Sequence, residues 1–342
     1  MNKIFLLFLA CTIVFLCISA VDIHPQEPPF RYSIRKTGYF PSESQIEKGC
    51  LLKNVRPFCT DGKQYIYVPD WNYATVYKFD MTGRILGSFG KKGQGPNEFQ
   101  TVSSIASFSR GLVIIDAGNM RVSITDFDGK QLNAFRIFKA YNAIVASHDG
   151  SRIYLASRNS QTKLIDVTNQ DGKLLASFGE RIAFKNKTTA LNDVFLSRNP
   201  VGDLWVAWKF FPIIRRYGSN GDLLSEFTIQ DEAISDFVHS NEEVGNSIQT
   251  GYKTDLMGII NGFFVTDSYY YVFLYGKNVK PRIIEYNFAG KQEATYEIVD
   301  YTEKEIFVDL VVYGKGTEKT FYVLEGFPEA RVDIFRKVIT SN

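Results

Sequence analysis

The sequence has little histidine and no hydrolase motif. Its three histidines, His24, His148 and His239, are scattered, and none lies near a cysteine. Because zinc sites need such ligands clustered at short spacings, a zinc enzyme is not indicated. No G-x-S-x-G motif occurs, and neither histidine of the folded region has a companion nucleophile, which argues against serine or cysteine catalysis. No cofactor or metal is therefore expected, and an enzyme is the less favoured interpretation.

Cysteine is also rare. Of the four cysteines, Cys11 and Cys17 lie within the first twenty residues, which leaves only Cys50 and Cys59 in the rest of the chain. In an oxidising compartment a disulfide between these two would close a short loop, whereas two buried thiols fit the same spacing equally well. The sequence alone leaves both alternatives open.

An excess of charge of either sign is missing as well. The 39 basic residues nearly balance the 37 acidic ones, which gives a formal net charge of +2. A polyanionic partner such as a nucleic acid is therefore not expected. The sequence is instead rich in aromatic residues, which make up 15% of the chain alongside many isoleucines and valines. This composition favours strands over helices.

The N-terminal segment, residues 1–21, carries one long uncharged run. Lys3 is followed by Ile4–Val21, which contains no charged residue. A basic start followed by such a run predicts a signal peptide or an N-terminal membrane anchor. Either interpretation predicts an exported protein that is periplasmic, on the cell surface or secreted.

Three fates of this segment fit the sequence. Cleavage after Ala20, lipid attachment at Cys11 or Cys17, and retention as a membrane anchor all stay open at this point. In each case the proline-containing residues 22–30 are expected to form an extended tether to the folded domain.

An element of two apolar strands joined by a short polar loop recurs six times. The copies are Tyr65–Asp70 with Thr75–Phe79, Leu112–Asp116 with Val122–Asp126, Ile153–Ala156 with Lys163–Asp166, Leu204–Trp208 with Ile213–Tyr217, Tyr270–Leu274 with Arg282–Tyr286, and Phe321–Glu325 with Val332–Phe335. A turn that ends in glycine follows each of the first five copies and leads into a further apolar run. Other turns join the copies to an earlier strand, so each period holds four strands linked by hairpins.

The predicted fold is all-β: a six-bladed β-propeller of four-stranded antiparallel blades over residues 31–342. Single sheets of this size cannot bury their faces, and radial stacking solves that problem. A β-sandwich is the rival architecture, but it does not require six comparable copies. The sixth copy lacks an outermost strand, so we predict that Arg31–Phe40 fills that place and closes the ring. Residues 229–257 form an insertion, with a short helix expected over Asp231–Glu243.

One copy resembles the NHL repeat. Gly87-Ser-Phe-Gly90, Gly93, Gly95-Pro96 and Glu98-Phe99, followed by Asp116-Ala-Gly-Asn-Met-Arg-Val122, match its G-x-F-G-x-x-G-x-G-P-x-x-F and D-x-x-N-x-R-V stretches. The whole chain resembles the exported six-bladed propellers of bacteria, many of which have no assigned activity, so the resemblance implies a fold and no reaction. The glycine-rich stretch lies between two expected strands with no helix after it. It is therefore interpreted as a connection between blades and not as a phosphate-binding loop.

The loops between the second and third strands of the blades are expected on one face, and they carry aromatic and basic residues. The candidate binding residues on this face are Trp71, Tyr73, Asn119, Arg121, Arg158, Phe210 and Phe211. Such side chains anchor partners at low entropic cost. The favoured hypothesis is a non-enzymatic binding or scaffold module outside the cytoplasm that engages a protein, peptide or glycan. Asn119 and Arg121 also have a structural alternative, because their motif positions tie neighbouring strands. For Trp71, Tyr73, Phe210 and Phe211, packing between blades is an equally good explanation.

The alternative function is a calcium-dependent hydrolase or lactonase. Such an enzyme would need oxygen ligands near the ring axis. The sequence offers Asn142, Asn192, Asp193 and Asp309 at expected strand ends. Ordinary turn and strand-end roles explain the same residues, so convergence of three or more of them on one axial point is the condition for this hypothesis.

Overall fold

The computed structural model describes residues 29–157, 163–185, 190–247 and 256–338. The chain divides into two units, Met1–Phe30 and Arg31–Asn342, and the second holds nearly all of the described residues. The uncharged run Ile4–Val21 lies outside them. Among the residues that are described, no helix is long and apolar enough to span a membrane.

The described strands form six antiparallel blades of four strands each. Blade 1 contains β2 (Cys59–Thr60), β3 (Tyr65–Asp70), β4 (Thr75–Asp80) and β5 (Ile85–Phe89); blade 2 contains β6 (Val102–Phe108), β7 (Gly111–Asp116), β8 (Arg121–Thr125) and β9 (Gln131–Arg136); blade 3 contains β10 (Ala143–Ala146), β11 (Ile153–Ala156), β12 (Ile165–Thr168) and β13 (Leu174–Phe178). Blade 4 contains β14 (Val194–Arg198), β15 (Leu204–Trp208), β16 (Ile213–Tyr217) and β17 (Leu223–Thr228); blade 5 contains β18 (Ile260–Val265), β19 (Tyr269–Gly276), β20 (Val279–Asn287) and β21 (Gln292–Ile298); blade 6 contains β22 (Ile306–Tyr313), β23 (Thr320–Phe327), β24 (Arg331–Lys337) and β1 (Phe30–Phe40). The predicted six-bladed propeller is confirmed.

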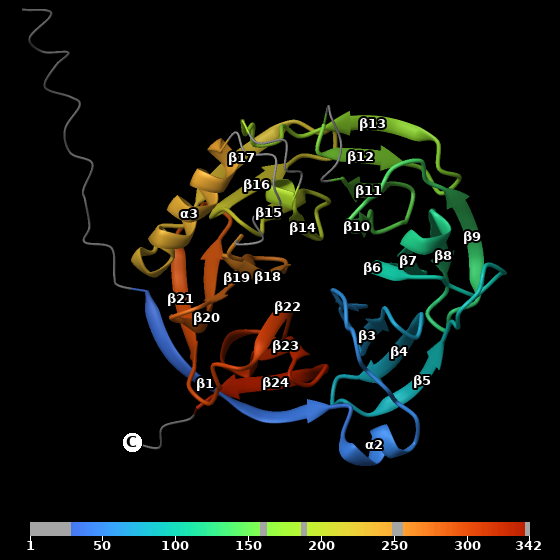
Figure 1. Cartoon of the computed structure of the whole chain (residues 1–342), viewed down its shortest axis with the longest axis horizontal. Helices are drawn as coiled ribbons and strands as arrows, with labels where there is room; N and C mark the ends of the chain where they lie inside the picture. Colours follow the sequence, from blue (N-terminus) through green and yellow to red (C-terminus); the bar gives the residue numbers. More distant parts are fainter. Residues whose placement is uncertain (1–28, 158–162, 186–189, 248–255, 339–342) are drawn as a thin grey trace, which may run out of the picture. The chain divides into compact units, whose positions relative to one another are not determined.

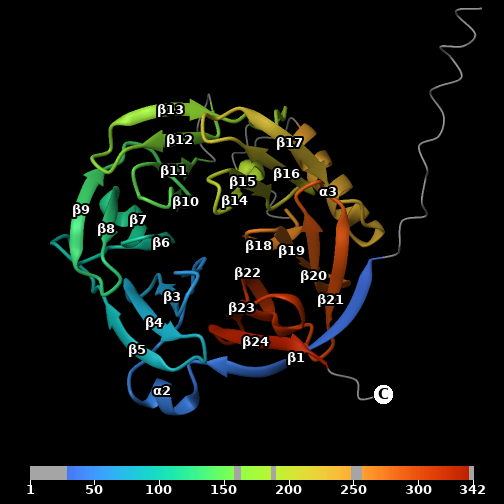
Figure 2. The same cartoon turned by 180° about the vertical axis from the view of Figure 1, so that it is seen from behind.

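The position of a strand within its blade explains its composition. The first strands lie near the axis and the fourth strands at the rim (Figures 1 and 2). Second strands such as β7 and β15 are buried along their whole length, because neighbouring blades cover both faces, and they read as continuous apolar runs. Rim strands such as β17 are exposed at every second residue or more. The core therefore consists of the layers between adjacent blades.

The N-terminal strand β1 closes the ring. It pairs antiparallel with β24, where Ile34 lies opposite Lys337 and Phe40 lies opposite Val332. The predicted pairing of Arg31–Phe40 with the sixth copy is confirmed. The same strand is also hydrogen-bonded to β21, so that blades 5 and 6 share one eight-stranded sheet. This second pairing was not foreseen from the sequence.

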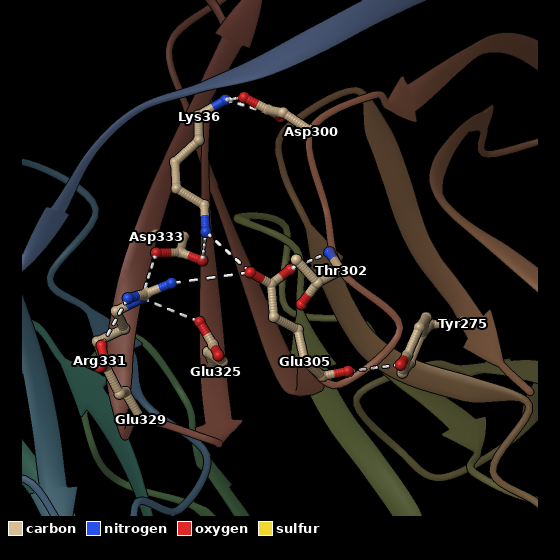
Figure 3. A network of polar contacts seen from close by, with 9 residues as sticks. All are labelled: Lys36, Tyr275, Asp300, Thr302, Glu305, Glu325, Glu329, Arg331 and Asp333. Carbon is tan, nitrogen blue, oxygen red and sulfur yellow. Dashed lines mark hydrogen bonds and ion pairs between the residues drawn. The ribbon is translucent and has the colours of Figure 1, made fainter.

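A cluster of charges holds β1 against blade 6 (Figure 3). The Nζ atom of Lys36 lies 2.8 Å from Asp333 Oδ2 and 3.3 Å from Glu305 Oε1. The Nε atom of Arg331 lies 2.9 Å from both Asp333 Oδ1 and Glu325 Oε2. Glu325 and Asp333 are fully buried, and Glu305 is nearly so. Burial, followed by the nearby carboxylate of Asp333, raises the pKa of Glu325 to about 7.

Hairpins at the rim are locked by a phenylalanine from the preceding blade. Gly129 and Gly172 adopt φ values of +88° and +80°, which favour glycine. A Cβ atom at either position would lie 2.1 Å or 2.5 Å from a phenylalanine ring. In the described chain this contact occurs between Phe40 and Gly83, Phe89 and Gly129, Phe135 and Gly172, Phe178 and Gly221, and Phe227 and Gly290. The recurring glycine and phenylalanine of the sequence are thus two halves of one contact between blades.

Short helices lie between the strands. They are α2 (Glu43–Glu47), η1 (Ala117–Asn119), η2 (Ala190–Asn192), η3 (Glu232–Ile234), α3 (Ser235–Asn246) and η4 (Gly316–Glu318). The helix expected in the insertion is present as η3 and α3, beside β17 and β21 at the rim (Figure 1). Asn241 of α3 donates hydrogen bonds to the carbonyl oxygens of Phe210 (2.9 Å) and Met257 (2.8 Å). This helix therefore supports the loop between β15 and β16.

The two cysteines of the propeller are free thiols. Cys50 follows α2 and is buried, which raises its pKa to about 12. Cys59 begins β2, and burial raises its pKa as well. Of the two alternatives left open by the sequence, the disulfide is wrong and the pair of thiols is correct.

Candidate binding site at the channel mouth

The first strands of all six blades surround a cavity of about 430 Å³ on the ring axis. Because the strands of a blade alternate in direction, the first strand begins and the second strand ends on the same face of the ring. The loops between second and third strands lie on that face too, which we call the loop face. We call a group of five residues the channel mouth. Asn142, Lys209 and Asp309 line the cavity, whereas Arg56 and Asp193 directly precede the lining residues Pro57 and Val194.

Asp193 is the centre of the polar contacts at the channel mouth. It lies just before β14, and its Oδ1 accepts a hydrogen bond from the amide of Asn142 in blade 3. Its Oδ2 lies 3.2 Å from the Nζ of Lys209, which also lies 4.8 Å from the ring centre of Phe195. Both carboxylate oxygens are therefore engaged, and the charge of Asp193 is largely compensated by Lys209.

Asp309 of β22 is the second carboxyl group of the channel mouth, and it is buried. It accepts hydrogen bonds from the backbone N–H groups of Phe58 (3.1 Å) and Leu310 (2.9 Å). Burial raises the pKa of Asp309 to about 7, although these hydrogen bonds and the charge of Lys209 act in the opposite direction. Near neutral pH this group is therefore present in both protonation states.

Arg56 differs from the other members because it has no acceptor. Its guanidinium carbon lies 4.1 Å from the ring centre of Trp71, in a cation–π contact. Its Nε is buried and makes no hydrogen bond, and none of the described residues forms an ion pair with it. Burial lowers the pKa of Arg56, and the carboxylate of Asp193 opposes that shift. Arg56 directly precedes Pro57 and Phe58, two residues that line the axial cavity.

Asp70 at the end of β3 positions both Arg56 and Trp71. One of its oxygens accepts hydrogen bonds from the backbone N–H groups of Lys53 (2.6 Å) and Asn54 (2.9 Å), and the other accepts from Tyr73 (2.9 Å). The segment before β2 is thereby tied to the loop after β3. The buried carboxylate of Asp70 therefore fixes the relative position of the two segments that carry Arg56 and Trp71.

The fold can be compared with that of known proteins. Residues 45–308 match the model of a family described as "6-bladed beta-propeller". The chain belongs to this family. No curated protein matches the sequence.

Solved structures similar to this propeller include three that cover most of the chain. A protein from Bacteroides fragilis described as a candidate exported protein has a TM-score of 0.59 at 14% identity, over 91% of this chain and 99% of that one. A member of the duf4221 family from Bacteroides vulgatus has a TM-score of 0.54 at 10% identity, over 91% and 97% of the two chains. A streptogramin B lyase has a TM-score of 0.53 at 12% identity, over 86% of each chain. At these identities the similarity shows the fold alone.

The motif residues of blade 2 have a structural role in this propeller. Arg121 donates to the carbonyl oxygens of Gln94 (3.0 Å), Gly95 (3.2 Å) and Glu98 (2.5 Å), and its Nε lies 3.1 Å from Asp116 Oδ2. Asn119 donates to the same carboxylate oxygen at 2.7 Å and to the carbonyl of Gly93 at 2.9 Å. Both polar groups are thus occupied in holding the glycine-rich connection between blades. These contacts favour the structural alternative for Asn119 and Arg121 over a role as binding anchors.

The other predicted anchors have different environments. Trp71 is half-buried under Arg56, and Tyr73 is 40% exposed on the same loop. Phe210 is half-buried against the core, and Arg158 lies outside the described residues. Phe211 is only 4% exposed and stacks on Phe184 with ring centres 5.1 Å apart. For Phe211 the structure supports packing and not an exposed anchor, because its ring is buried against Phe184.

Three of the four oxygen ligands proposed for calcium, Asn142, Asp193 and Asp309, belong to the channel mouth, but they already have other partners in the structure. Asn192 is buried, and its Oδ1 accepts from the indole Nε1 of Trp208 (3.2 Å) and from the backbone of Ile182 (2.9 Å). Asp193 is compensated by Lys209 as described above. Among the described residues, no group of three or more His, Cys, Asp or Glu side chains is arranged to hold a metal ion. The condition set for the hydrolase hypothesis concerns Asn side chains as well, so the convergence of its four residues on one axial point stays a prediction.

Arg56 was missed by the sequence analysis. It lies outside the loops between second and third strands, in the connection that precedes the two-residue strand β2. The available signal was a basic residue three positions before a first strand, whereas Asp193 lies directly before the first strand of blade 4. First strands begin at the axis. Residues just before a first strand are therefore candidates for a site at the cavity, as are the loops between second and third strands.

Proposed function

We propose that this propeller is a non-enzymatic binding module outside the cytoplasm, and that its ligand binds at the channel mouth. The observation that carries the proposal is the Arg56 guanidinium, which is stacked on Trp71 and has no acceptor among the described residues. A concave site with apolar walls and a few convergent polar groups is the usual form of a ligand site. The cavity below the mouth, with Phe58, Phe195 and Phe263 among its lining residues, provides such walls.

The loop face supplies the outer part of the proposed site. Trp71 and Tyr73 lie on the loop after β3, and the exposed fraction of Tyr73 leaves its ring open to a partner. A protein, peptide or glycan would place one group in the cavity and rest its remainder on this loop. Aromatic anchors of this kind contribute much of the binding energy in known interfaces.

The location outside the cytoplasm is supported by two observations. The first is the uncharged run Ile4–Val21 after Lys3, and the second is the similarity in fold to a candidate exported protein of Bacteroides fragilis. Measuring the mass of the mature N-terminus from fractionated cells tests this part. A shortened or lipid-modified N-terminus in a membrane or periplasmic fraction is expected, whereas a full-length chain in the cytosol would contradict export.

An array of peptides and glycans, probed with the full chain, tests the binding function. For a ligand found in this way, Trp71→Ala should weaken binding by about tenfold or more, equivalent to ~1.4 kcal/mol, while the thermal midpoint changes little. The matched control is Leu224→Ala, an exposed apolar residue on the rim strand β17. Equal affinity for the wild type and both variants would contradict a site at the channel mouth.

A further inference from the structure

We infer that the channel mouth recognises a single carboxylate group of its ligand, and that Arg56 is the residue that binds this group. The inference rests on the proposed function and deepens it by naming the chemical class of the ligand. It follows from a comparison of the three tryptophans of the chain, each of which has an arginine stacked on its ring.

Two of the three arginine–tryptophan pairs are completed by a carboxylate. Arg216 lies 5.5 Å from the ring centre of Trp205, and its Nε and Nη2 donate to Asp203 Oδ2 at 2.8 Å and 2.5 Å. Arg215 lies 4.8 Å from the ring centre of Trp208, and its Nε donates to Glu226 at 2.5 Å. In both pairs the ring covers one face of the guanidinium, and a carboxylate binds its edge.

The third pair lacks this acceptor. Arg56 has the shortest arginine–tryptophan distance of the three, 4.1 Å, and no carboxylate of the described chain reaches its edge. A partly desolvated guanidinium without an acceptor is unfavourable unless something completes it. Its outer edge carries parallel N–H groups that match the two oxygens of a carboxylate. A ligand carboxylate in that place would make the third pair equivalent to the other two.

The surroundings favour one negative charge over two. Lys209 is the second cation of the mouth, but it is already paired with Asp193 at 3.2 Å. Asp309, the other carboxyl group, loses its proton near neutral pH and then repels an incoming anion. The repulsion between Asp309 and a doubly charged phosphate would be about twice that felt by a singly charged carboxylate. The single positive charge of Arg56 is enough to balance a carboxylate.

The experiment uses small carboxylates that fit a cavity of about 430 Å³. N-acetylphenylalanine and its neutral amide represent a peptide end, and glucuronate and glucose represent an acidic sugar and its neutral counterpart. Isothermal titration of the full chain should show that one acid binds at least about tenfold more tightly than its neutral partner. The acid that binds identifies the source of the carboxylate. Equal binding of acid and neutral partner, or binding of neither acid at millimolar concentration, would overturn the inference.

Variants at Arg56 give a second readout that needs no ligand. Arg56→Met should leave the thermal midpoint unchanged or raise it, because it removes a half-buried charge that forms no ion pair with the described residues and keeps an apolar side chain beside Trp71. The matched control, Arg216→Met, should lower the midpoint, because it leaves Asp203 without its guanidinium. Arg56→Gln should also abolish the preference for the acid over its neutral partner, and Arg56→Lys should restore part of it. A midpoint that falls equally in Arg56→Met and Arg216→Met would mean that Arg56 is structural and would refute the inference.

Failure of the inference can be distinguished from failure of the proposed function. If a ligand from the array loses affinity with Trp71→Ala but not with Arg56→Gln, the binding site stands and the carboxylate is rejected. If neither substitution changes the affinity, the site itself is rejected.

Discussion

Phe40 of the closing strand covers Gly83 in the first blade, so closely that a Cβ atom on Gly83 would lie 2.7 Å from Cδ1 of the ring. The other contacts of this kind join blades that follow each other in sequence. The contact between Phe40 and Gly83 instead joins the outermost strand of blade 6 to blade 1. The ring is therefore closed by the same contact that stacks its other blades, in addition to the pairing of β1 with β24.

Replacing Gly83 by alanine should destabilise the propeller more than replacing Gly62. Both glycines have positive φ, +86° and +75°, so both substitutions introduce backbone strain of about 1–2 kcal/mol. Only at Gly83 would the new Cβ also displace a ring, which adds about 1–3 kcal/mol, whereas nothing lies within 4 Å of a Cβ at Gly62. Urea unfolding of both variants measures the difference. Equal losses would show that the Phe40 contact does not hold the ring closed.

Phe211→Ala should cost about 3–5 kcal/mol of unfolding free energy, because a buried aromatic side chain leaves a cavity. The same change at Tyr73, on the loop after β3, should stay within about 0.5 kcal/mol, because that ring is exposed. Denaturant unfolding of the two variants compares a buried with an exposed aromatic of the loop face. A small loss at Phe211 would restore it as an anchor that is free to bind.

The stability of the ring closure should fall as pH rises. The pKa of Glu325 is about 7 in the folded protein, above its ordinary value of 4.5. A group with a raised pKa contributes its stability in full below the ordinary value, and this contribution is lost as pH rises through the folded value. Arg331 and Lys36 face Glu325 as cations, and Asp333 and Glu305 face it as carboxylates. Unfolding free energies measured between pH 4.5 and about 7 should therefore include a decrease from this group.

Substitution isolates that contribution. Glu325→Gln should make the decrease over this pH range smaller, because the amide does not ionise, while Asp309, whose pKa is also raised to about 7, still contributes to it. Glu329→Gln is the matched control, since Glu329 also contacts Arg331, at 2.7 Å, but its side chain is 70% exposed. If Glu325→Gln kept the full pH dependence of the wild type, the decrease would belong to other groups.

Arg121→Ala should loosen the glycine-rich connection of blade 2. The variant loses hydrogen bonds to the carbonyls of Gln94, Gly95 and Glu98, each worth about 1 kcal/mol or more for a charged donor. Hydrogen exchange of the amides in residues 90–99 should accelerate, with little change in blade 4. Arg136→Ala is the control, because Arg136 lies directly opposite on β9 and is exposed. Unchanged exchange in residues 90–99 would contradict the clamp.

Much of the fold was determined by local sequence signals. Paired apolar strands and turn glycines recur at regular spacing because each hairpin needs a positive φ at the same place. The motif of Asp116, Asn119 and Arg121 is also local, since its acceptors lie in the adjacent connection. The closing role of Arg31–Phe40 followed from counting strands. These features depend on contacts within one blade or between neighbours along the chain.

The candidate site was decided only by the tertiary structure. Arg56 and Asp193 are 137 positions apart in the sequence, and both directly precede residues that line the axial cavity only because six blades form a closed ring. Whether Phe211 is exposed depends on how its loop packs on Phe184, which no turn pattern encodes. Cys50 and Cys59 likewise needed their relative positions before the free thiols could be told from a disulfide. Hairpins arise from backbone preferences of a few residues, whereas a site on the axis depends on the convergence of distant strands.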